Sequence, residues 1–426
     1  MHLNKKSIVF LAAISITQQS VAAETLEQAF SAAVLNNQTI FAAKLNSLVA
    51  EQQTSAARGQ RLPRVNLQGG YQQLSETPSA KTVVGGQEAE FEMSQAGSAN
   101  AQAIVSLPVF TSGRISHSIE AAEANALASQ YNESTLILNI KLKVANAFIA
   151  IFRAQKALEV AQSHVKILKA HTNDVNNLYQ QGMVARNDSL AVEVELSNAQ
   201  QGVLQQENSL QIAQAGFNQL LNRDLTAEVD LQEYLPTLLQ GDFSALSEQA
   251  LIKRTELYAL TEQRRALEQQ SASVIANLWP QVSVSGGYQY QQNQYQTYEG
   301  MWQASAMVQW QVYDGSTSHR SDALISQARA VDLQRQDLIA MITLQVRQAW
   351  LATQETQKRI AVTQKAISQA EENLKVNSER YQQGVATHTE VLDAEDLRIR
   401  SYDNFNNARY DAVMAQLNLR RAVGVL

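Results

Sequence analysis

The sequence of 426 residues contains no cysteine, which excludes disulfide bonds, thiol catalysis, thiolate metal sites and a lipid anchor on a cysteine at a cleavage point. It has only 5 prolines, and a chain rich in glutamine and poor in proline suits long helices with polar exposed faces. Beyond Ala23 we find no stretch that approaches the roughly 18 apolar residues of a membrane-spanning helix. A chain of this kind that enters a membrane must do so with strands.

Basic residues are also fewer than acidic ones. The chain carries 34 lysines and arginines against 40 aspartates and glutamates, a formal net charge of −6. This balance argues against nucleic acid and against an anionic membrane surface as partners, because both are bound through basic patches.

The N-terminal segment has the three parts of a secretory signal peptide. Lys5 and Lys6 form a basic start, residues 8–16 are apolar, and Val21 and Ala23 are small residues before a cleavage point. We therefore predict that residues 1–23 are a signal peptide. The alternative is an ordinary buried N-terminal helix.

One pattern then occurs twice. Leu62-Pro63-Arg64-Val65 matches Trp279-Pro280-Gln281-Val282, and the Tyr-Gln-Gln-Gly sequence that ends at Gly182 recurs 202 residues later at Gly384. The first copy holds about fifteen extra residues, mostly over 72–97. The sequence therefore predicts a first repeat over 24–222, a linker over 223–242 and a second repeat over 243–426.

Each repeat reads as helix, strand, strand, helix, turn, helix. In the first strand Val65, Leu67 and Tyr71 share one face, with polar residues between them. The predicted strands cover about 65–75, 99–109, 282–292 and 302–312, each the length of a tilted membrane strand. The predicted helices cover about 25–60, 113–181, 187–221, 245–277, 316–383 and 388–423.

The two longest predicted helices carry coiled-coil patterns, because apolar and small residues recur in them at spacings of three and four. The seam in the first repeat consists of Ile137, Ile140, Val144, Ala147, Ile151, Ala154, Leu158, Ala161, Val165, Leu168, Thr172, Val175 and Tyr179. The same positions 202 residues later form a weaker seam in the second repeat. A stripe from Leu138 to Phe152 runs beside the first seam, so this helix is predicted to pack against two neighbours.

Four strands per chain cannot close a barrel, and their outer edges would expose unpaired backbone groups to lipid. Three chains would supply twelve strands, but two chains also permit closure, so the residues alone predict only an oligomer. Aromatic residues mark both ends of the strands, as at the two interfaces of a membrane barrel. They are Phe110, Trp279, Trp310 and Tyr313 at one end, and Tyr290, Tyr295, Tyr298 and Trp302 at the other. In the alternative interpretation these rings pack under the loops of a soluble sheet.

The paired Leu/Trp-Pro strand starts, the paired Tyr-Gln-Gln-Gly turns and the segment 417–424 together resemble the TolC family of outer-membrane efflux proteins. The resemblance covers essentially all of 24–426. It implies a mainly α fold with a β-barrel portion: a homotrimer with a twelve-stranded barrel in outer-membrane lipid and an α-helical tunnel in the periplasm of a Gram-negative bacterium. Some relatives carry an N-terminal lipid, and this sequence lacks the cysteine for it.

The function that the resemblance implies is an exit duct, which passes drugs or secreted protein outward from a periplasmic adaptor and an inner-membrane pump of the RND, ABC or MFS type. A conduit dedicated to type I secretion is an alternative within this class. A trimeric coiled-coil adhesin or stalk is an alternative from another class, although an adhesin would lack the paired strands. We find no Walker loop, no paired-histidine zinc helix and no dinucleotide-binding glycine pattern, so we expect no enzyme activity, cofactor or metal.

Acidic residues follow the second turn. Glu390 and Asp393 are three residues apart on one helical face, and three chains would bring six such carboxylates together. The resemblance implies that they form a periplasmic gate. The alternative is a capping box formed by Thr387 and Glu390, which leaves Asp393 unexplained. In the first repeat Asp188 has no acidic neighbour, because Ala191 replaces the second carboxylate.

The turns themselves are the second candidate site. Glycine at these two positions is predicted to end the preceding helix. The resemblance implies that the adaptor contacts grooves beside the turns, and the alternative is that the glycines serve only the turn. The candidate contact residues are Gly182, Met183, Val184, Gly384, Val385 and Ala386.

Overall fold

The computed structural model describes residues 23–426, so the predicted signal peptide lies outside the described residues except for Ala23. The helices are α1 (Leu26–Asn36), α2 (Gln38–Gly59), α3 (Arg114–Gln180), α4 (Arg186–Leu220), α5 (Phe243–Lys253), α6 (Thr255–Ile275), the 3-10 helix η1 (Ala276–Leu278), α7 (Thr317–Gln382) and α8 (His388–Val423). The strands are β1 (Arg64–Gln73), β2 (Ser79–Val84), β3 (Gln87–Glu92), β4 (Gly97–Phe110), β5 (Gln281–Gln291) and β6 (Gly300–Gln309).

The helices α3 and α7 are 67 and 66 residues long, or about 100 Å each at ~1.5 Å per residue. No proline or glycine interrupts either of them. Glycines with positive φ stand at both ends of α3: Gly113 precedes it with φ of 86°, and Gly182 follows it with φ of 74°. The chain leaves the helical conformation at these points because glycine adopts positive φ without steric cost.

Two of the predicted helices are divided in the structure. The range 25–60 contains α1 and α2, which are separated at Asn37, and the Asn37 side chain accepts hydrogen bonds from the first N–H groups of α2. The range 245–277 contains α5, α6 and η1, because Arg254 takes an extended conformation with ψ of 112°. Neither break involves glycine or proline, so the breaker pattern did not reveal them.

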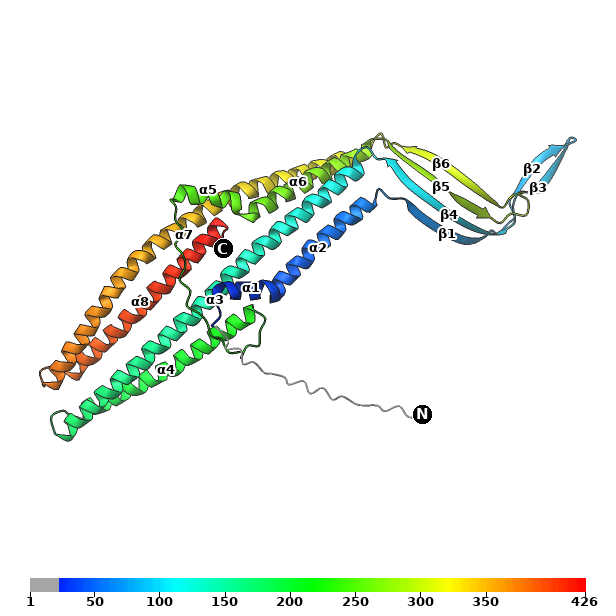
Figure 1. Ribbon diagram of the computed structural model, residues 1–426. Helices are drawn as coiled ribbons and strands as arrows, with labels where there is room; N and C mark the ends of the chain where they lie inside the picture. The colour runs from blue at the N-terminus through cyan, green and yellow to red at the C-terminus, as the bar shows by residue number, and fades with distance from the viewer. Residues whose placement is uncertain (1–22) are drawn as a thin grey trace, which may run out of the picture. The chain divides into compact units, whose positions relative to one another are not determined.

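The four long strands form one antiparallel sheet in the order β1–β4–β5–β6 (Figure 1). Each repeat supplies two neighbouring strands, with Val65 opposite Val105 in one pair and Val282 opposite Val308 in the other. The repeats meet where β4 pairs with β5. The outer strands β1 and β6 are exposed along nearly all of their length. In the described chain, the outer edges of β1 and β6 carry unpaired backbone N–H and C=O groups. Strands of further chains must pair with these groups before the sheet can be inserted in lipid.

The extra residues of the first repeat form a hairpin that the sequence pattern did not predict. β2 and β3 pair along their whole length, from Ser79 opposite Glu92 to Val84 opposite Gln87. The turn consists of two glycines, 85 and 86, with φ of 64° and 88°, and two consecutive positive values are typical of a type I′ hairpin turn.

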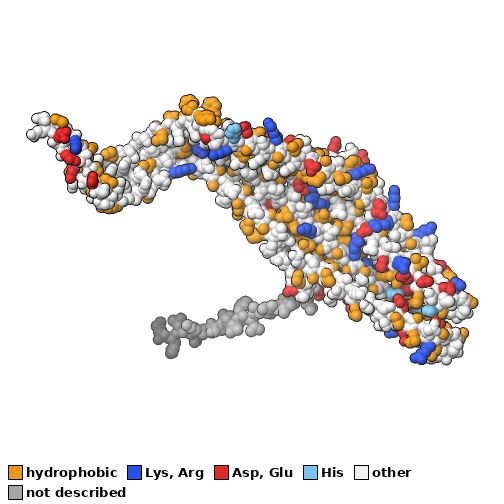
Figure 2. Space-filling view, turned by 180° about the vertical axis from the view of Figure 1, so that it is seen from behind, with side chains coloured by type: hydrophobic (Ala, Val, Ile, Leu, Met, Phe, Trp, Pro, Cys, Tyr) orange, Lys and Arg blue, Asp and Glu red, His pale blue; other side chains and the backbone are white. Residues whose placement is uncertain are grey.

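Large apolar side chains are exposed on the sheet and at its junction with the helices. Figure 2 shows hydrophobic side chains gathered at this junction and few charged ones along the four long strands. The four aromatic residues predicted at this end, among them Trp279 and Trp310, are 55% to 85% exposed. At the other end Tyr298 and Trp302 are 73% and 81% exposed. A contiguous exposed apolar surface fits lipid contact better than burial under the loops of a soluble sheet.

The described chain divides into two compact units, and unit 1 comprises residues 23–35 together with 143–237 and 358–414. An aromatic cluster lies in its core, with ring centroids 5.5 to 6.3 Å apart. The cluster consists of Phe148 and Phe152 of α3, Phe217 of α4 and Tyr410 of α8. Burial raises the pKa of the Tyr410 hydroxyl to about 12, so this hydroxyl stays protonated at physiological pH.

Unit 2 comprises residues 36–142, 238–357 and 415–426, and it contains all six strands. In its core, Leu246 and Leu257 from the short helices α5 and α6 pack against Ile342 and Val346 of α7. The end of α8 completes this core with Leu419. Ile342 and Val346 belong to the seam of the second repeat, so this part of the seam faces the core of unit 2.

One described helix, α3, is long and apolar enough, by length and composition, to cross a membrane. This finding corrects our expectation that no stretch beyond Ala23 approaches a membrane helix. The physical reason is that the seam and the second stripe lie side by side, so part of α3 is apolar around much of its circumference. Core helices of bundles that are buried on several sides share this composition.

Candidate functional site

The two helical hairpins of unit 1, α3–α4 and α7–α8, end in turns of the same geometry (Figure 1). In the first turn the Gly182 N–H donates to the Tyr179 carbonyl and the Met183 N–H donates to the Leu178 carbonyl, both at 2.9 Å. The same two bonds recur in the second turn, from Gly384 to Tyr381 at 2.9 Å and from Val385 to Arg380 at 3.0 Å. This pair of bonds around a residue with positive φ is the Schellman motif, which satisfies the last carbonyl groups of a helix.

We expect Gly384→Ala to destabilise the protein through backbone strain alone. Gly384 has φ of 74°, and an added Cβ would meet no atom within 4 Å. The free energy of unfolding should fall by about 1 kcal/mol, measured by denaturant titration of the purified oligomer. The matched control is Gly202→Ala in the interior of α4, where the space is equally open and φ is not positive. That variant should gain about 0.5–1 kcal/mol, and a loss at both positions would contradict the strain argument.

Glu390 caps the start of α8. Its Oε1 accepts a hydrogen bond from the Thr387 backbone N–H at 3.1 Å, and its own N–H donates to Thr387 Oγ1 at 3.4 Å. This reciprocal arrangement is a capping box. Glu390 Oε2 also lies 3.2 Å from Arg380 Nη1. The hydrogen bond from the Thr387 backbone, assisted by the charge of Arg380, holds the pKa of Glu390 below its usual value.

Asp393 differs from Glu390 in its surroundings. It is exposed one turn further along α8, and within residues 23–426 its side chain makes no hydrogen bond or ion pair. Capping therefore accounts for Glu390 and leaves Asp393 without a structural role in the described chain. At the start of α4, Asp188 lies 3.8 Å from His388 Nδ1 of α8. The carboxylates of the two repeats thus have different partners.

The six turn residues predicted to contact an adaptor fall into two groups. Met183 and Val385 are 65% and 62% exposed, and the two glycines beside them are exposed as well. Val184 and Ala386 are half-buried and pack against a small core between the hairpins. That core, which we call the tip core, consists of Val175, Val192, Tyr381 and Val391 from α3, α4, α7 and α8. Only the first group offers free surface in the described chain.

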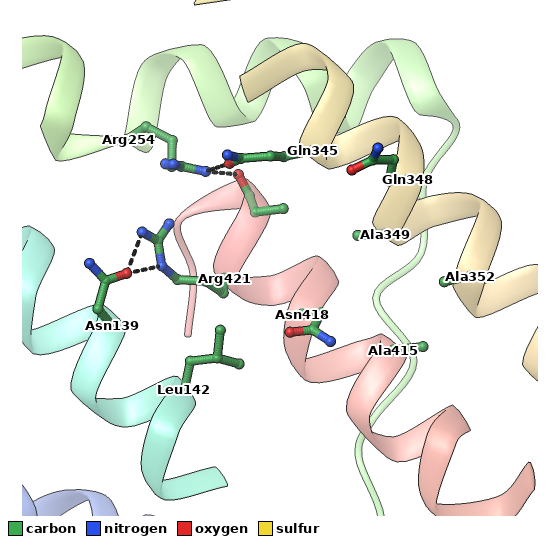
Figure 3. Close-up of a pocket in the computed structure, with 11 residues that line it drawn as sticks. Asn139, Leu142, Arg254, Gln345, Gln348, Ala349, Ala352, Ala415, Asn418 and Arg421 are labelled. Atoms are coloured by element: carbon green, nitrogen blue, oxygen red, sulfur yellow. Dashed lines mark hydrogen bonds between the residues drawn. The ribbon is translucent and has the colours of Figure 1, made fainter. Parts of the chain in front are cut away.

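Unit 2 contains a cluster of charged residues that was not predicted from the sequence. Arg254 donates from Nε and Nη2 to the Glu256 carboxylate at 2.9 and 3.0 Å, and from Nη1 to Gln345 Oε1 at 3.0 Å. Arg421 donates to Glu256 at 2.8 Å and to Asn139 at 2.6 Å. Arg254, Arg421, Asn139 and Gln345 line a cavity of about 460 Å³ (Figure 3). The cluster joins α3, α6, α7 and α8, which is a structural role.

A second ion cluster is buried in unit 1. Glu395 of α8 is 1% exposed, accepts two hydrogen bonds of 2.8 Å from Arg398, and lies 3.1 Å from His164 Nδ1 of α3. Burial acts to raise the pKa of Glu395, but the bonds from Arg398 and His164 outweigh it, and the pKa lies below its usual value. Within residues 23–426, no three histidine, aspartate or glutamate side chains are placed to hold a metal ion.

An open antiparallel sheet with exposed apolar surface, carried by a chain with helical hairpins of this length, defines a class of protein. It is the subunit of an oligomeric channel that combines a membrane barrel with a helical tunnel. The model of the family described as outer membrane efflux protein matches residues 29–223 and 246–425. The chain belongs to this family, and the two matched ranges correspond to its two repeats.

Individual relatives agree with this assignment. Outer membrane protein TolC of Vibrio cholerae serotype O1 is 21% identical to the chain over 428 residues, which cover 97% of this chain and 94% of that protein. The outer membrane channel CmeC of Campylobacter jejuni has a TM-score of 0.79 at 14% identity, covering 100% of this chain and 94% of the other. Outer membrane protein VceC of Vibrio cholerae has a TM-score of 0.78 at 17% identity, covering 94% and 96%.

The family defines what the chain does. Its members are homotrimeric outer-membrane channels of tripartite efflux systems, so this chain is an outer-membrane exit duct and not an enzyme. The edge strands β1 and β6 lie at the two ends of the four-stranded sheet, where neighbouring copies in such a trimer can pair with them. The adhesin or stalk alternative is thereby set aside.

Proposed function

We propose that the hairpin ends of unit 1 form the periplasmic gate and the adaptor-docking surface of this duct. Glu390 and Asp393 line the gate, and the exposed residues beside Gly182 and Gly384 contact a periplasmic adaptor. An inner-membrane pump of the RND, ABC or MFS type drives the cargo, and a signal peptide cleaved near Ala23 directs the chain to export. The observation that carries the gate proposal is Asp393, an exposed carboxylate near the turn with no partner in the described chain.

The physical basis is the repetition of charge by symmetry. In a trimer each acidic residue occurs three times around one axis, and carboxylates at a narrow opening attract cations and repel anions. A multivalent cation that bridges several carboxylates should bind more tightly than a monovalent one and block the current. Arg380 neutralises part of the charge of Glu390. Asp393 should therefore contribute more to selectivity than Glu390 does.

The test is a variant that removes charge and keeps the fold. In the double variant Glu390→Gln/Asp393→Asn the glutamine can still accept the Thr387 N–H, because glutamine also forms capping boxes. We expect the cation preference to weaken and the block by a trivalent cation to need about ten-fold more blocker, measured by single-channel recording in planar bilayers. The melting temperature should stay close to that of the parent.

Two further variants separate the explanations. Glu390→Ala removes the cap as well as the charge, so it should lower stability more than Glu390→Gln does. Asp396→Asn neutralises an exposed carboxylate one turn beyond Asp393 that is already paired with Arg400. It should leave selectivity unchanged. Unaltered selectivity and block in the double variant would refute the gate.

A further inference from the structure

A histidine and a tyrosine are buried side by side between the two hairpins of unit 1. His171 of α3 is 8% exposed and Tyr381 of α7 is 6% exposed. Their ring centroids are 5.2 Å apart, with an angle of 63° between the ring planes. Tyr381 belongs to the tip core, so the pair lies where the α3–α4 and α7–α8 hairpins pack together.

Both side chains carry a buried polar atom without a partner. Among the described residues, His171 Nε2 and the Tyr381 hydroxyl are fully buried and make no hydrogen bond. A buried polar group without a hydrogen-bond partner destabilises the packed state, because it has lost its bonds to water. An apolar pair of the same shape would stabilise the tip core better, so maximal stability does not explain these residues.

The charged and titratable groups around the His171–Tyr381 pair come from all four helices of the tip. Asp174 lies on α3 itself, Asp188 on α4, Tyr381 on α7 and His388 on α8. Burial lowers the pKa of His171, the charge of Asp174 partly opposes this, and His388 lowers the pKa further. At neutral pH His171 is therefore an uncharged imidazole inside an apolar contact.

We propose that His171 is a proton-controlled latch, which holds the two hairpins together while it is uncharged and releases them when it takes up a proton. The proposed separation of the hairpins depends only on the buried pair and its contacts. The further claim, that this separation widens the channel end, rests on the gate proposed above.

The direction of the pH dependence follows from proton binding. A separated tip exposes His171 to water, where an imidazole has a pKa of about 6.5. The packed tip has a lower pKa and binds fewer protons, so acid favours the separated state. Packing is complete above about pH 6.5 and weakens as the pH falls from there toward the lowered pKa of the packed state.

The second repeat provides an internal comparison. The position 202 residues after His171 is Asn373, which does not titrate, and the counterpart of Tyr381 is Tyr179, which is 41% exposed. The buried pair thus occurs once per chain, although the Tyr-Gln-Gln-Gly turn that follows it occurs twice. The shared turn therefore does not require the pair.

The latch is testable by measuring the distance between the two turns. The chain has no cysteine, so Met183→Cys and Val385→Cys provide unique positions for two spin labels. The labelled chain is diluted with unlabelled chain, so that each full-length trimer carries at most one labelled protomer. Pulsed electron paramagnetic resonance then gives the distance distribution from pH 8.0 to pH 5.0. We expect acid to increase the ratio of separated to packed tips, by about ten-fold for each unit by which packing lowers the pKa of His171.

Matched variants decide the assignment. His171→Phe retains burial and removes the proton, so its tips should stay packed at pH 5.0. Tyr381→Phe keeps His171 but removes a buried hydroxyl that has no partner within the described chain, so the packed tip should be more stable and release should need a lower pH than in the parent. His319→Gln, at an exposed histidine of unit 2, should behave as the parent does. Equal acid release in His171→Phe and the parent, or no release in the parent, overturns the latch.

Two safeguards keep these outcomes distinct. If His171→Phe does not assemble, His171→Asn decides in its place, because asparagine is polar, does not titrate and occurs at the matching position 373 of the second repeat. Acid release equal to that of the parent would then overturn the latch. Single-channel conductance is recorded in parallel on the parent and His171→Phe. Tips that separate in acid without a rise in conductance would confirm the latch and refute the gate at this end.

Discussion

Replacing Val144 or Ile151 with proline should abolish trimer assembly. Both side chains are 0% exposed and lie in the interior of α3, which runs without a break from Arg114 to Gln180. A proline removes the hydrogen bond to the residue four positions earlier, and its ring clashes with that carbonyl, which costs about 3 kcal/mol or more. We expect no trimer from either variant when outer membranes are extracted in mild detergent and analysed by size-exclusion chromatography with light scattering.

The control is a proline in a helix of the same unit where the backbone can accept it. Arg186 is the first residue of α4, and the preceding Ala185 is extended with φ of −80° and ψ of 156°. Proline is favoured at the first position of a helix and after an extended residue. Arg186→Pro should therefore give the parent yield of trimer. Normal yield from both interior variants would show that assembly does not depend on α3 as one continuous helix.

The long helices and the strands of the sheet could be predicted from the sequence, because the patterns that indicate them are local and occur in both repeats. A run free of glycine and proline between Gly113 and Gly182 bounds α3, and the helix observed begins and ends within a residue of the predicted range. Strict alternation located β1 from Val65 to Tyr71. Both patterns occur again in the second repeat, so the two repeats independently predict the same order of helices and strands.

The breaks between the short helices could not be predicted from the sequence, because no glycine or proline lies at either of them. Asn37 separates α1 from α2 as an N-cap, yet asparagine also occurs at several positions within the long helices. Arg254 separates α5 from α6, and its extended backbone accompanies bonds to Glu256 and Gln345 that only the folded chain brings together. Tertiary contacts rather than local propensity determine such positions.

The β2–β3 hairpin carries a local signal that the repeat comparison obscured. Its two glycines lie between a short segment that ends in two valines and the segment 88–92, which alternates in polarity, and paired glycines between such segments are a hairpin signature. The second repeat has no matching segment, so aligning the two repeats identifies this region only as an insertion and predicts no structure for it. An insertion has no counterpart to confirm it, so its structure must be read from its own residues.

The candidate site was only partly predictable. The spacing of Glu390 to Thr387 allowed a capping box as the alternative to the gate, and the structure shows both bonds of that capping box. The partners of charged residues across different helices did not follow, since sequence spacing gives neighbours only within one helix. Glu395 and Arg398 have the spacing of an exposed surface pair, although Glu395 is 1% exposed and contacts His164 on another helix.

The buried position of Glu395 leads to the second large expected effect. Glu395→Gln keeps the volume of the side chain but leaves the Arg398 guanidinium, 9% exposed, without its carboxylate. Removing one partner of a buried ion pair typically costs about 3–5 kcal/mol. We expect a loss of roughly 3 kcal/mol in the free energy of unfolding, measured by guanidinium denaturation of the purified trimer. The matched control is Asp396→Asn, which breaks an exposed pair of the same helix and should cost at most about 0.5 kcal/mol.

The pH dependence of this loss identifies its cause. The pKa of Glu395 is lowered in the folded chain, so its ion pair contributes stability above the ordinary pKa of a glutamate and loses it as the pH falls through the lowered value. The parent should therefore lose its advantage over Glu395→Gln in strong acid. The double variant Glu395→Leu/Arg398→Leu removes both charges and should be more stable than Glu395→Gln, because no uncompensated charge remains buried. If the single variant were as stable as the parent at neutral pH, water rather than Glu395 would be compensating Arg398.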